Sequence, residues 1–564
     1  MNSALKLLAL LACLGLATFY IYQIHGAPPV GIDDANIFFT YSHNLAAGKG
    51  IVYANNPEPV EGFTSLAWML ICALLFAAGF SETAVLIVSV LLLVGTHAYI
   101  TGLIGRIASA NGRSSLPYQL AYVFFIILSA PYMTWMTITL MDTCLWGLVV
   151  AIIAGSILSP PERASQWLLP SMVIVAAPVV RPESMLVVPF ALSLLWRYGV
   201  RISDDTCLRA TRSLFVAFLA IMAVLTGFRL WYFGYPLPNT YYAKVSPSLI
   251  YNISTGFDYL VEFLGSGILV GIGTIVLIVL VILNALRRLQ QPALAASSTS
   301  LNYQHYALFC LLLFVLPVLT GGDHFAMSRF LQPVFPLLCL ALVIFFIEIR
   351  PSQKPFVAFL YRHGAVVLIL LALLDCVLFA WGNGASLSSW RWESPIDNEF
   401  RIAEKGIALG IRLNSLFAEL PVKPGVAVIP AGGIARSYSG PIIDLLGLND
   451  LRFSHYQGKR EGMRGHASFE KEPFFSICPD ILIGVPPGAD KGTWFTNDTL
   501  KGLLLEPAFA AQYRYGSLAR VDFSDLQLTS FFSLSFLAAV ADYPQLKFTE
   551  TMRFDGTSYV KLAH

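Results

Sequence analysis

Long apolar runs constrain the fold of this sequence more than any other feature. A helix needs about 20 mostly apolar residues to cross the roughly 30 Å hydrocarbon core of a membrane. Among its 564 residues, 56% are hydrophobic and only 12% are charged, whereas about a quarter of a soluble globular chain is charged. We therefore predict a polytopic α-helical membrane protein with about eleven transmembrane helices, at approximately 4–24, 84–105, 117–133, 140–158, 167–180, 184–198, 213–232, 261–286, 304–320, 331–349 and 363–382.

A further apolar run at 65–80 is ambiguous, and the charges of the loops decide how it is interpreted. Cytoplasmic loops accumulate Lys and Arg. If 65–80 does not cross, nearly all the basic inter-helix clusters fall on one side, among them Arg106, Arg113, Arg163, Arg197, Arg201, Arg209, Arg212, Arg287, Arg288, Arg350, Lys354 and Arg362. We therefore predict that 65–80 is membrane-parallel or re-entrant. The amino terminus then lies on the cytoplasmic side of a bacterial inner (plasma) membrane, and the chain after Trp381 lies on the outer side, in the periplasm.

The composition changes after residue 382. Residues 383–564 mix polar and apolar residues and contain short β-like runs at 425–430 and 480–484, which are typical of strands. We predict a transmembrane domain at 1–382, with a first outer loop at 25–64, and an extracytoplasmic soluble α/β domain at 383–564. The net charge of +2 argues against a nucleic-acid partner, which would need a basic patch.

The remaining unusual residues collect in the predicted outer loops. The first loop carries the adjacent carboxylates Asp33 and Asp34 before an amphipathic helix, and acids beside a membrane are costly to keep without a use. Taken alone, the pair is better explained by one residue that caps the helix and a solvated neighbour. The first loop also carries Glu61. The other outer loops add polar residues close to span ends, namely Asp142, Arg181, Glu183, Asn239, Tyr241, Tyr242, Lys244, Asp323, His324 and Arg329. Many of these residues, taken one at a time, have a structural explanation: a salt bridge between loops, a lysine that reaches the lipid headgroups, or an aromatic residue at the membrane interface. Together they predict an outward cavity that suits an anionic lipid headgroup and a polyhydroxylated acceptor.

At these residues the sequence resembles the bacterial GT-C glycosyltransferases that use polyprenyl-phosphate sugars, and most closely their terminal arabinofuranosyltransferase and LphB-like branch. The motifs follow in chain order over roughly residues 30–480: Asp33-Asp34-Ala35-x-Ile37, Glu61-Gly62-x-Thr64-Ser65, Arg181-Pro182-Glu183, Leu237 to Lys244, Gly321-Gly322-Asp323 with Arg329-Phe330, and Ile443-Asp444-x-x-Gly447-Leu448. One departure is Met141-Asp142-Thr143, where the family pattern has Glu before Thr. The resemblance implies a GT-C-like transmembrane fold with membrane-parallel helices, a catalytic acid in the first outer loop and a C-terminal soluble domain.

Sugar transfer from a lipid phosphate needs one good base, because the phosphate leaves as a stable anion. By analogy with inverting glycoside chemistry, Asp33 or Asp34 would deprotonate the acceptor hydroxyl. We favour Asp33 as the base and Asp34 as its partner or as a sugar-hydroxyl acceptor, although the sequence does not order them. Arg329, Lys244 or Arg181 would stabilise the departing phosphate, with help from His324. Asn239, Tyr241 and Glu61 are candidates to hold sugar hydroxyls, and Glu183 could orient a cation.

The predicted partners are a polyprenyl-phosphate sugar, a cell-envelope glycan, lipid or protein acceptor, and membrane lipid. Arabinofuranose is preferred through the resemblance alone. No cofactor is predicted: Asp33, Asp34 and Asp323 could hold Mg²⁺ or Mn²⁺ through oxygen ligands, but the cations already supply phosphate neutralisation. The main alternative is a transporter or flippase of a lipid-linked sugar. Transporters often place their binding residues at the membrane midplane within repeated halves, whereas these residues cluster at one face. A sensor or assembly protein is a third reading, which leaves Asp33 and Asp34 unexplained.

Overall fold

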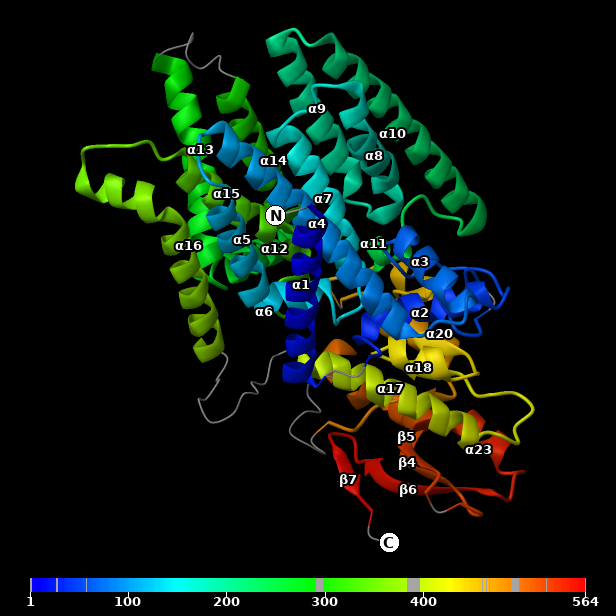
Figure 1. The fold of residues 1–564 in the computed structure, drawn as a ribbon. Coiled ribbons are helices and arrows are strands. Elements are labelled where there is room, and N and C mark those ends of the chain that lie inside the picture. The colour runs from blue at the N-terminus through cyan, green and yellow to red at the C-terminus, as the bar shows by residue number, and fades with distance from the viewer. Residues whose placement is uncertain are drawn as a thin grey trace.

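The protein has a bundle of apolar helices with a C-terminal α/β domain at one end (Figure 1). The computed structural model describes residues 3–26, 29–56, 58–290, 298–382, 396–458, 460–462, 464–465, 467–487, 497–523 and 525–562. The predicted boundary between the two domains, at 382 and 383, borders a stretch that lies outside the described residues. The Ala- and Ser-containing segment between α13 and α14 also begins outside them.

The helical region contains α1 (Ser3–His25), α2 (Asp33–Ala46), α3 (Leu66–Ala77), α4 (Glu82–Ala110), α5 (Leu116–Leu128), α6 (Ala130–Met136), α7 (Thr143–Leu158), the 3-10 helix η1 (Ala164–Trp167), α8 (Leu168–Val180), α9 (Ser184–Ile202), α10 (Asp205–Tyr232), α11 (Asn239–Lys244), α12 (Leu249–Leu264), α13 (Ile268–Gln290), α14 (Ser298–Thr320), the 3-10 helix η3 (Arg329–Val334), α15 (Phe335–Glu348) and α16 (Pro355–Gly382).

Within the described residues, seven helices are long and apolar enough to cross a membrane. The count rises to nine if two bent pairs each form one span, α5 with α6 at 75° and α12 with α13 at 110°. Three shorter apolar stretches, Leu66–Ala77, Thr143–Leu158 and Ala164–Val180, fall below that length. The prediction of a polytopic helical membrane protein is therefore confirmed, with seven to nine candidate spans where the sequence suggested about eleven. The difference lies in the bent pairs and in the short helices α7 and α8. The helix in the ambiguous run, α3, is only 12 residues long and is not a candidate span.

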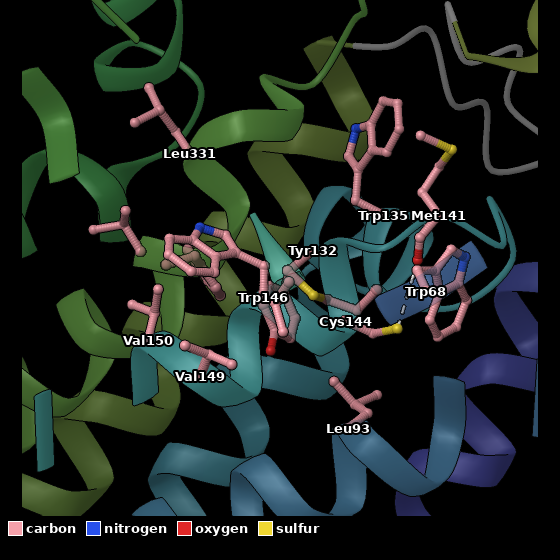
Figure 2. Packing of buried hydrophobic residues seen from close by; sticks show 14 of the residues in the cluster. Trp68, Leu93, Tyr132, Trp135, Met141, Cys144, Trp146, Val149, Val150 and Leu331 are labelled. Carbon is pink, nitrogen blue, oxygen red and sulfur yellow. Dashed lines mark hydrogen bonds between the residues drawn. The ribbon is translucent and has the colours of Figure 1, made fainter. Parts of the chain in front are cut away.

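Large aromatic side chains fill the core around α7 (Figure 2). Trp68 and Trp135 are fully buried, and the Trp68 indole donates a hydrogen bond to the Leu140 carbonyl over 3.1 Å. The Cys144 thiol donates weakly to the Met141 carbonyl over 3.6 Å. These contacts hold the short loop before α7 against α3, and they fix the place of Asp142, the residue that precedes α7.

The C-terminal domain contains α17 (Asp397–Leu416), β1 (Val426–Val428), α18 (Gly432–Ser437), β2 (Ile442–Asp444), α19 (Leu451–Ser454), α20 (Lys471–Ile477), β3 (Ile481–Leu482), the 3-10 helix η4 (Leu503–Leu505), α22 (Pro507–Gln512), β4 (Tyr513–Arg520), β5 (Gln527–Ser533), α23 (Leu534–Val540), β6 (Leu546–Phe554) and β7 (Tyr559–Lys561). Its seven strands form one mixed sheet in the order β2-β1-β3-β5-β4-β6-β7. The strand β1 pairs in parallel with β2 and β3, and the other pairs are antiparallel. The predicted α/β domain is confirmed, and its two β-like runs contain β1 and β3.

The loop at 25–64, which the sequence predicts to be the first outer loop, is packed against the C-terminal domain. The short helix α18 contacts both α2 of the loop and α17 of the domain. Phe39 of α2, Phe400 of α17 and Ile434 of α18 belong to one continuous cluster of buried apolar residues, which extends into the helical bundle. The two regions therefore share a core at this point, and the loop that carries Asp33 and Asp34 lies between them.

Candidate functional site

A cavity of about 490 Å³ opens where the loop at 25–64 meets the ends of several helices. This volume lies within the range of about 300–1,000 Å³ that is usual for ligand pockets. Charged and phenolic groups that line it are Asp34, Asp142, Arg181, Glu183, Tyr241, Lys244 and Arg329. Apolar groups that line it include Ile37, Phe38, Phe63, Met185, Leu186, Leu316, Leu319 and Phe330. The cavity thus combines a charged part with a long apolar wall.

Asp34 is the acidic residue of the first loop that faces this cavity. It lies in the first turn of α2, and its Oδ2 is 3.2 Å from Arg329 Nη1 and 3.9 Å from Lys244 Nζ. Burial alone would raise the pKa of this carboxyl, but Lys244 and Arg329 hold the pKa of Asp34 below its usual value. Asp34 is therefore an ionised carboxylate between two cations.

The carboxylate of Asp33 points instead into the C-terminal domain. Its Oδ2 accepts the backbone N–H of Gly432 and its Oδ1 accepts that of Gly433, both over 2.8 Å. The residue is buried, with 6% of its surface exposed, and it does not line the cavity described above. Burial raises the pKa of Asp33 to about 6, against the lowering effect of the two amides.

Arg329 is the central cation of the site. Its Nη2 lies 2.7 Å from Asp323 Oδ2, while its Nη1 reaches Asp34. The guanidinium also lies over the Phe325 and Phe330 rings, 4.5 Å and 4.9 Å from their centroids, where the ring faces attract cations. Although burial alone would raise it, Arg329 keeps the pKa of Asp323 well below its usual range. Asp323 therefore orients Arg329 from behind the cavity wall.

His324 lies beside this pair and outside the cavity lining. Its Nδ1 is 3.3 Å from Asp323 Oδ1, and its ring packs against Phe325 at a centroid distance of 4.0 Å. The side chain is thus placed to support Asp323, and the predicted assistance to the departing phosphate stays a prediction.

A second charged group also lines the cavity. Arg181 Nη1 is 3.1 Å from Asp142 Oδ2, and its Nη2 is 2.9 Å from Glu183 Oε1. Although burial alone would lower it, Asp142 and Glu183 raise the pKa of Arg181, so this guanidinium stays charged. The prediction that Glu183 orients a cation agrees with this geometry. The sequence analysis placed Asp142 near the predicted cavity without giving it a role, because its position between two spans gave no means of pairing it with Arg181.

Glu61 and Asn239 lie behind the cavity wall. Both Glu61 oxygens accept hydrogen bonds from Arg229, with Nε 2.8 Å from Oε2 and Nη2 2.9 Å from Oε1. The Asn239 amide donates to the carbonyls of Gly447 and Leu448 over 2.8 and 2.9 Å. These two residues therefore use their polar atoms within the protein, and a direct role for them in holding sugar hydroxyls stays a prediction.

Tyr241 and the aliphatic wall form the open side of the cavity. Tyr241 is 46% exposed, and the wall residues Met185, Leu186 and Leu319 are 43%, 53% and 39% exposed. These apolar groups belong to the candidate spans α9 and α14. An exposed apolar surface of this kind on membrane helices faces lipid, so the cavity opens from its charged part toward the hydrocarbon.

Two residues of the C-terminal domain also belong to the surroundings of the site. Leu448 lines the cavity. Glu399, in the first turn of α17, is half-buried, and burial together with the carboxylates of Asp34 and Asp33 raises its pKa to about 7. Sequence reasoning found neither residue in this role, because nothing in an isolated sequence shows that the domain folds back onto the loop. The motif 443–448 was the one available signal for Leu448.

Three or more His, Cys, Asp or Glu side chains do not come together in a metal-binding arrangement anywhere in the described ranges. Asp33 and Asp34 point in different directions, and Asp323 is engaged with Arg329. The expectation that no metal is used stays a prediction, which chelation can test.

The fold and the site define a class. The chain is a polytopic membrane protein whose seven to nine candidate spans are followed by a C-terminal α/β domain with a seven-stranded mixed sheet. A comparison with protein-family models finds no match, and a comparison with curated proteins finds no relative. Neither comparison identifies a family for this chain.

Proposed function

We propose that this protein is a membrane glycosyltransferase that moves a sugar from a polyprenyl-phosphate donor to an extracytoplasmic glycan, lipid or protein acceptor. The observation that carries the proposal is the cavity, which joins an ionised carboxylate and three cations to an apolar wall on membrane helices. A lipid phosphate carries these two features in the same order, a charged headgroup followed by an apolar tail.

The three cations suit the phosphate. Arg181, Lys244 and Arg329 line the same cavity, and guanidinium groups bind phosphate oxygens through paired hydrogen bonds. In the structure these three cations are paired with four carboxylates, those of Asp34, Asp142, Glu183 and Asp323. A donor phosphate that reaches Lys244 and Arg329 would compete with Asp34 for them. Asp34 would then lose its partners and become a stronger base as the donor binds.

We propose Asp34 as that base, although the sequence analysis favoured Asp33. The reason is access, since Asp34 lines the cavity whereas both Asp33 oxygens accept backbone amides. In the proposed step the acceptor hydroxyl oxygen forms a bond to the anomeric carbon, and its proton passes to the Asp34 carboxylate. The bond from that carbon to the phosphate oxygen breaks, and its electron pair leaves on the lipid phosphate beside Arg329 and Lys244. Attack opposite the leaving group inverts the anomeric carbon.

The finer assignments are part of the same proposal. Eleven crossings follow if the bent pairs and the short helices α7 and α8 each span the membrane, with α3 parallel to it. The α9–α10 turn lies at the end of the bundle away from the C-terminal domain (Figure 1). Arg201 at the end of α9 and Arg209 near the start of α10 flank this turn, and basic clusters of this kind favour the cytoplasmic side. This arrangement supports a periplasmic site in a bacterial inner membrane. The motifs support the GT-C family, its terminal arabinofuranosyltransferase branch and a furanose donor.

A transporter or flippase of lipid-linked sugars is the second candidate. An apolar cavity with a charged part can also carry a headgroup across a membrane. The position of the site favours a transferase, because the charged residues lie at helix ends and in loops beside the C-terminal domain, whereas transporter sites usually lie near the bilayer midplane.

Transfer assays with purified protein in lipid nanodiscs test the proposal. The donors are a panel of short-chain polyprenyl-phosphate sugars, and each is offered to wild type, Asp34→Asn and Asp33→Asn at equal folded yield, with and without EDTA. Asp542→Asn is the matched control, because Asp542 is exposed in the C-terminal domain and outside the site. We expect transfer by wild type and by the control, and a loss of at least a hundredfold in Asp34→Asn, which is the usual scale of general-base catalysis.

The outcomes separate the two candidate functions. Loss of transfer in Asp34→Asn alone supports the assignment of the base, and loss on chelation would overturn the metal-free chemistry. Transfer that survives in Asp34→Asn refutes Asp34 as the base. Absence of transfer with every donor, together with headgroup translocation in liposomes, would instead establish the flippase. Orientation is tested by labelling Val422→Cys on intact cells with a membrane-impermeant maleimide, since Val422 is 78% exposed.

A further inference from the structure

The first turn of α18 lies directly on the first turn of α2. Gly432 and Gly433 of the C-terminal domain donate their backbone N–H groups to the two oxygens of Asp33. Hydrogen bonds from backbone amides to a buried carboxylate are among the stronger ones in proteins. The acidic pair at the start of α2 is thus divided between two tasks, with Asp33 directed at the domain and Asp34 at the cavity.

Both glycines are needed for this close approach. A Cβ atom on Gly432 would lie 1.8 Å from the backbone oxygen of Asp33, and one on Gly433 would lie 2.3 Å from that of Ala403 in α17. Neither backbone oxygen is the flexible end of a side chain, so a larger residue would force the helices apart. The sequence Gly432-Gly433 therefore allows α18 to fit between α2 and α17.

Other contacts surround the same interface. The Tyr53 hydroxyl donates to the Ala431 carbonyl over 2.5 Å, and Arg436 Nη1 donates to Asn36 Oδ1 over 3.0 Å. Arg436 also pairs with Glu82 at the start of α4. The residues before, within and after the first turn of α18 are thus each bonded to the membrane region.

The docked domain forms part of the cavity. Leu448 lines it, and the segment 447–449 is held by two residues of the membrane region. Asn239 donates to the Gly447 and Leu448 carbonyls, and the Tyr41 hydroxyl donates to Asn449 Oδ1 over 3.1 Å. If the domain moved away from α2, this part of the cavity wall would move with it.

We propose that Asp33 is a positioning residue that docks the C-terminal domain onto the first outer loop and so completes the cavity that Asp34 faces. The docking contact is the pair of hydrogen bonds from Gly432 and Gly433. Its effect on turnover rests on the proposed function, but the contact itself can be measured without any transfer.

Hydrogen exchange of peptides that span α18 measures the docking directly. Asp33→Asn keeps the shape of the side chain but puts an amide N–H₂ group against one of the two glycine N–H donors, so one hydrogen bond is lost. We expect exchange in α18 to become faster by roughly tenfold to a hundredfold, the range for a hydrogen bond to a charged group. Gly432→Ala should give the same change from the other side, because the added methyl group separates α18 from α2. Asp34→Asn is the matched control, which leaves exchange in α18 unchanged.

Steady-state kinetics at equal folded yield then separates positioning from a purely structural role. Loss of docking should raise the KM for the donor in Asp33→Asn and in Gly432→Ala, because the wall that contains Leu448 is displaced. A change that acts only on folding would lower the folded yield and leave the KM of the folded molecules unaltered.

Each result decides the proposal. Faster exchange with a raised KM in both variants supports it. Unchanged exchange in Asp33→Asn overturns the docking contact, and faster exchange without a change in KM or kcat overturns the positioning role. Complete loss of kcat in Asp33→Asn with unchanged exchange would make Asp33 the base instead. If wild type transfers no sugar, the proposed function fails, and the exchange measurement alone decides whether Asp33 docks the domain.

Discussion

The buried ion pair between Glu61 and Arg229 offers the sharpest test of the packing behind the cavity. Its side chains are 2% and 4% exposed, and three hydrogen bonds of 2.8 to 3.1 Å join them. Unit charges 4 Å apart attract by about 4 kcal/mol at an effective dielectric constant of 20. Removal of one partner from a buried pair costs about 3–5 kcal/mol, because the other charge is left uncompensated. We expect Glu61→Ala and Arg229→Ala each to lower the free energy of unfolding by an amount in that range.

The double variant distinguishes this explanation from simple loss of packing. With both charges gone no lone charge stays buried, so the combined cost should fall short of the sum of the single costs by about 2–3 kcal/mol. Steric trapping or denaturant titration in mixed micelles measures these free energies. Arg553→Ala is the control, since Arg553 pairs with Glu550 but is 64% exposed, and it should leave the stability almost unchanged. Additive costs in the double variant, or a cost below 1 kcal/mol in Glu61→Ala, would refute the description of the pair as buried and coupled.

Three further predictions follow from the site. Glu399 has a pKa raised to about 7 in the folded protein, so its burial destabilises the protein above that pH, and this penalty disappears as the pH falls toward the pKa of Glu399 in the unfolded chain. Glu399→Gln should therefore raise the free energy of unfolding at pH 8 by about 1–3 kcal/mol and give no gain at pH 4.5. A series of thermal unfolding measurements that shows equal gains at both pH values would contradict this. Gly62→Ala would place a Cβ 1.9 Å from Asn449 Oδ1 and 2.7 Å from the Tyr41 hydroxyl, so it should break the Tyr41–Asn449 contact and lower the melting temperature; a variant as stable as wild type would disprove the close approach. Arg329→Lys keeps the positive charge, but the lysine ammonium cannot reach Asp34 and Asp323 together. Binding of a short-chain polyprenyl phosphate, measured by fluorescence titration, should therefore weaken by roughly tenfold to a hundredfold. Unchanged binding would show that Arg329 is not part of the phosphate site.

Much of the candidate site could be predicted from the sequence, because polar residues at the ends of apolar runs are conspicuous. Asp34, Arg181, Glu183, Tyr241, Lys244 and Arg329 were all named from their loops, and the structure brings them to one cavity. The residues that the sequence placed in the site but that lie behind its wall, such as Glu61 and Asn239, have partners far away in the chain. Arg229 is 168 positions from Glu61, and periodicity gives no information about such a pairing.

The order of the two aspartates shows the same limit. Adjacent residues in the first turn of a helix point in directions about 100° apart, since an α-helix has 3.6 residues per turn, so they must face different surroundings. The sequence shows that both carboxylates are present, but it does not show which part of the folded protein each carboxylate contacts. The packing of α18 against α2 assigns Asp33 to the domain and Asp34 to the cavity.

The sequence by itself determined that the chain enters a membrane many times, that an α/β domain follows, and which loops carry charge. These properties depend on the local balance of apolar and polar residues, which water and lipid sort without reference to distant parts of the chain. The tertiary structure decided which charges pair, which carboxylate stays accessible, and that the C-terminal domain supplies part of the cavity wall. Those outcomes depend on contacts between residues up to about 400 positions apart, and such contacts are selected by shape and by the cost of leaving a buried polar group without a partner.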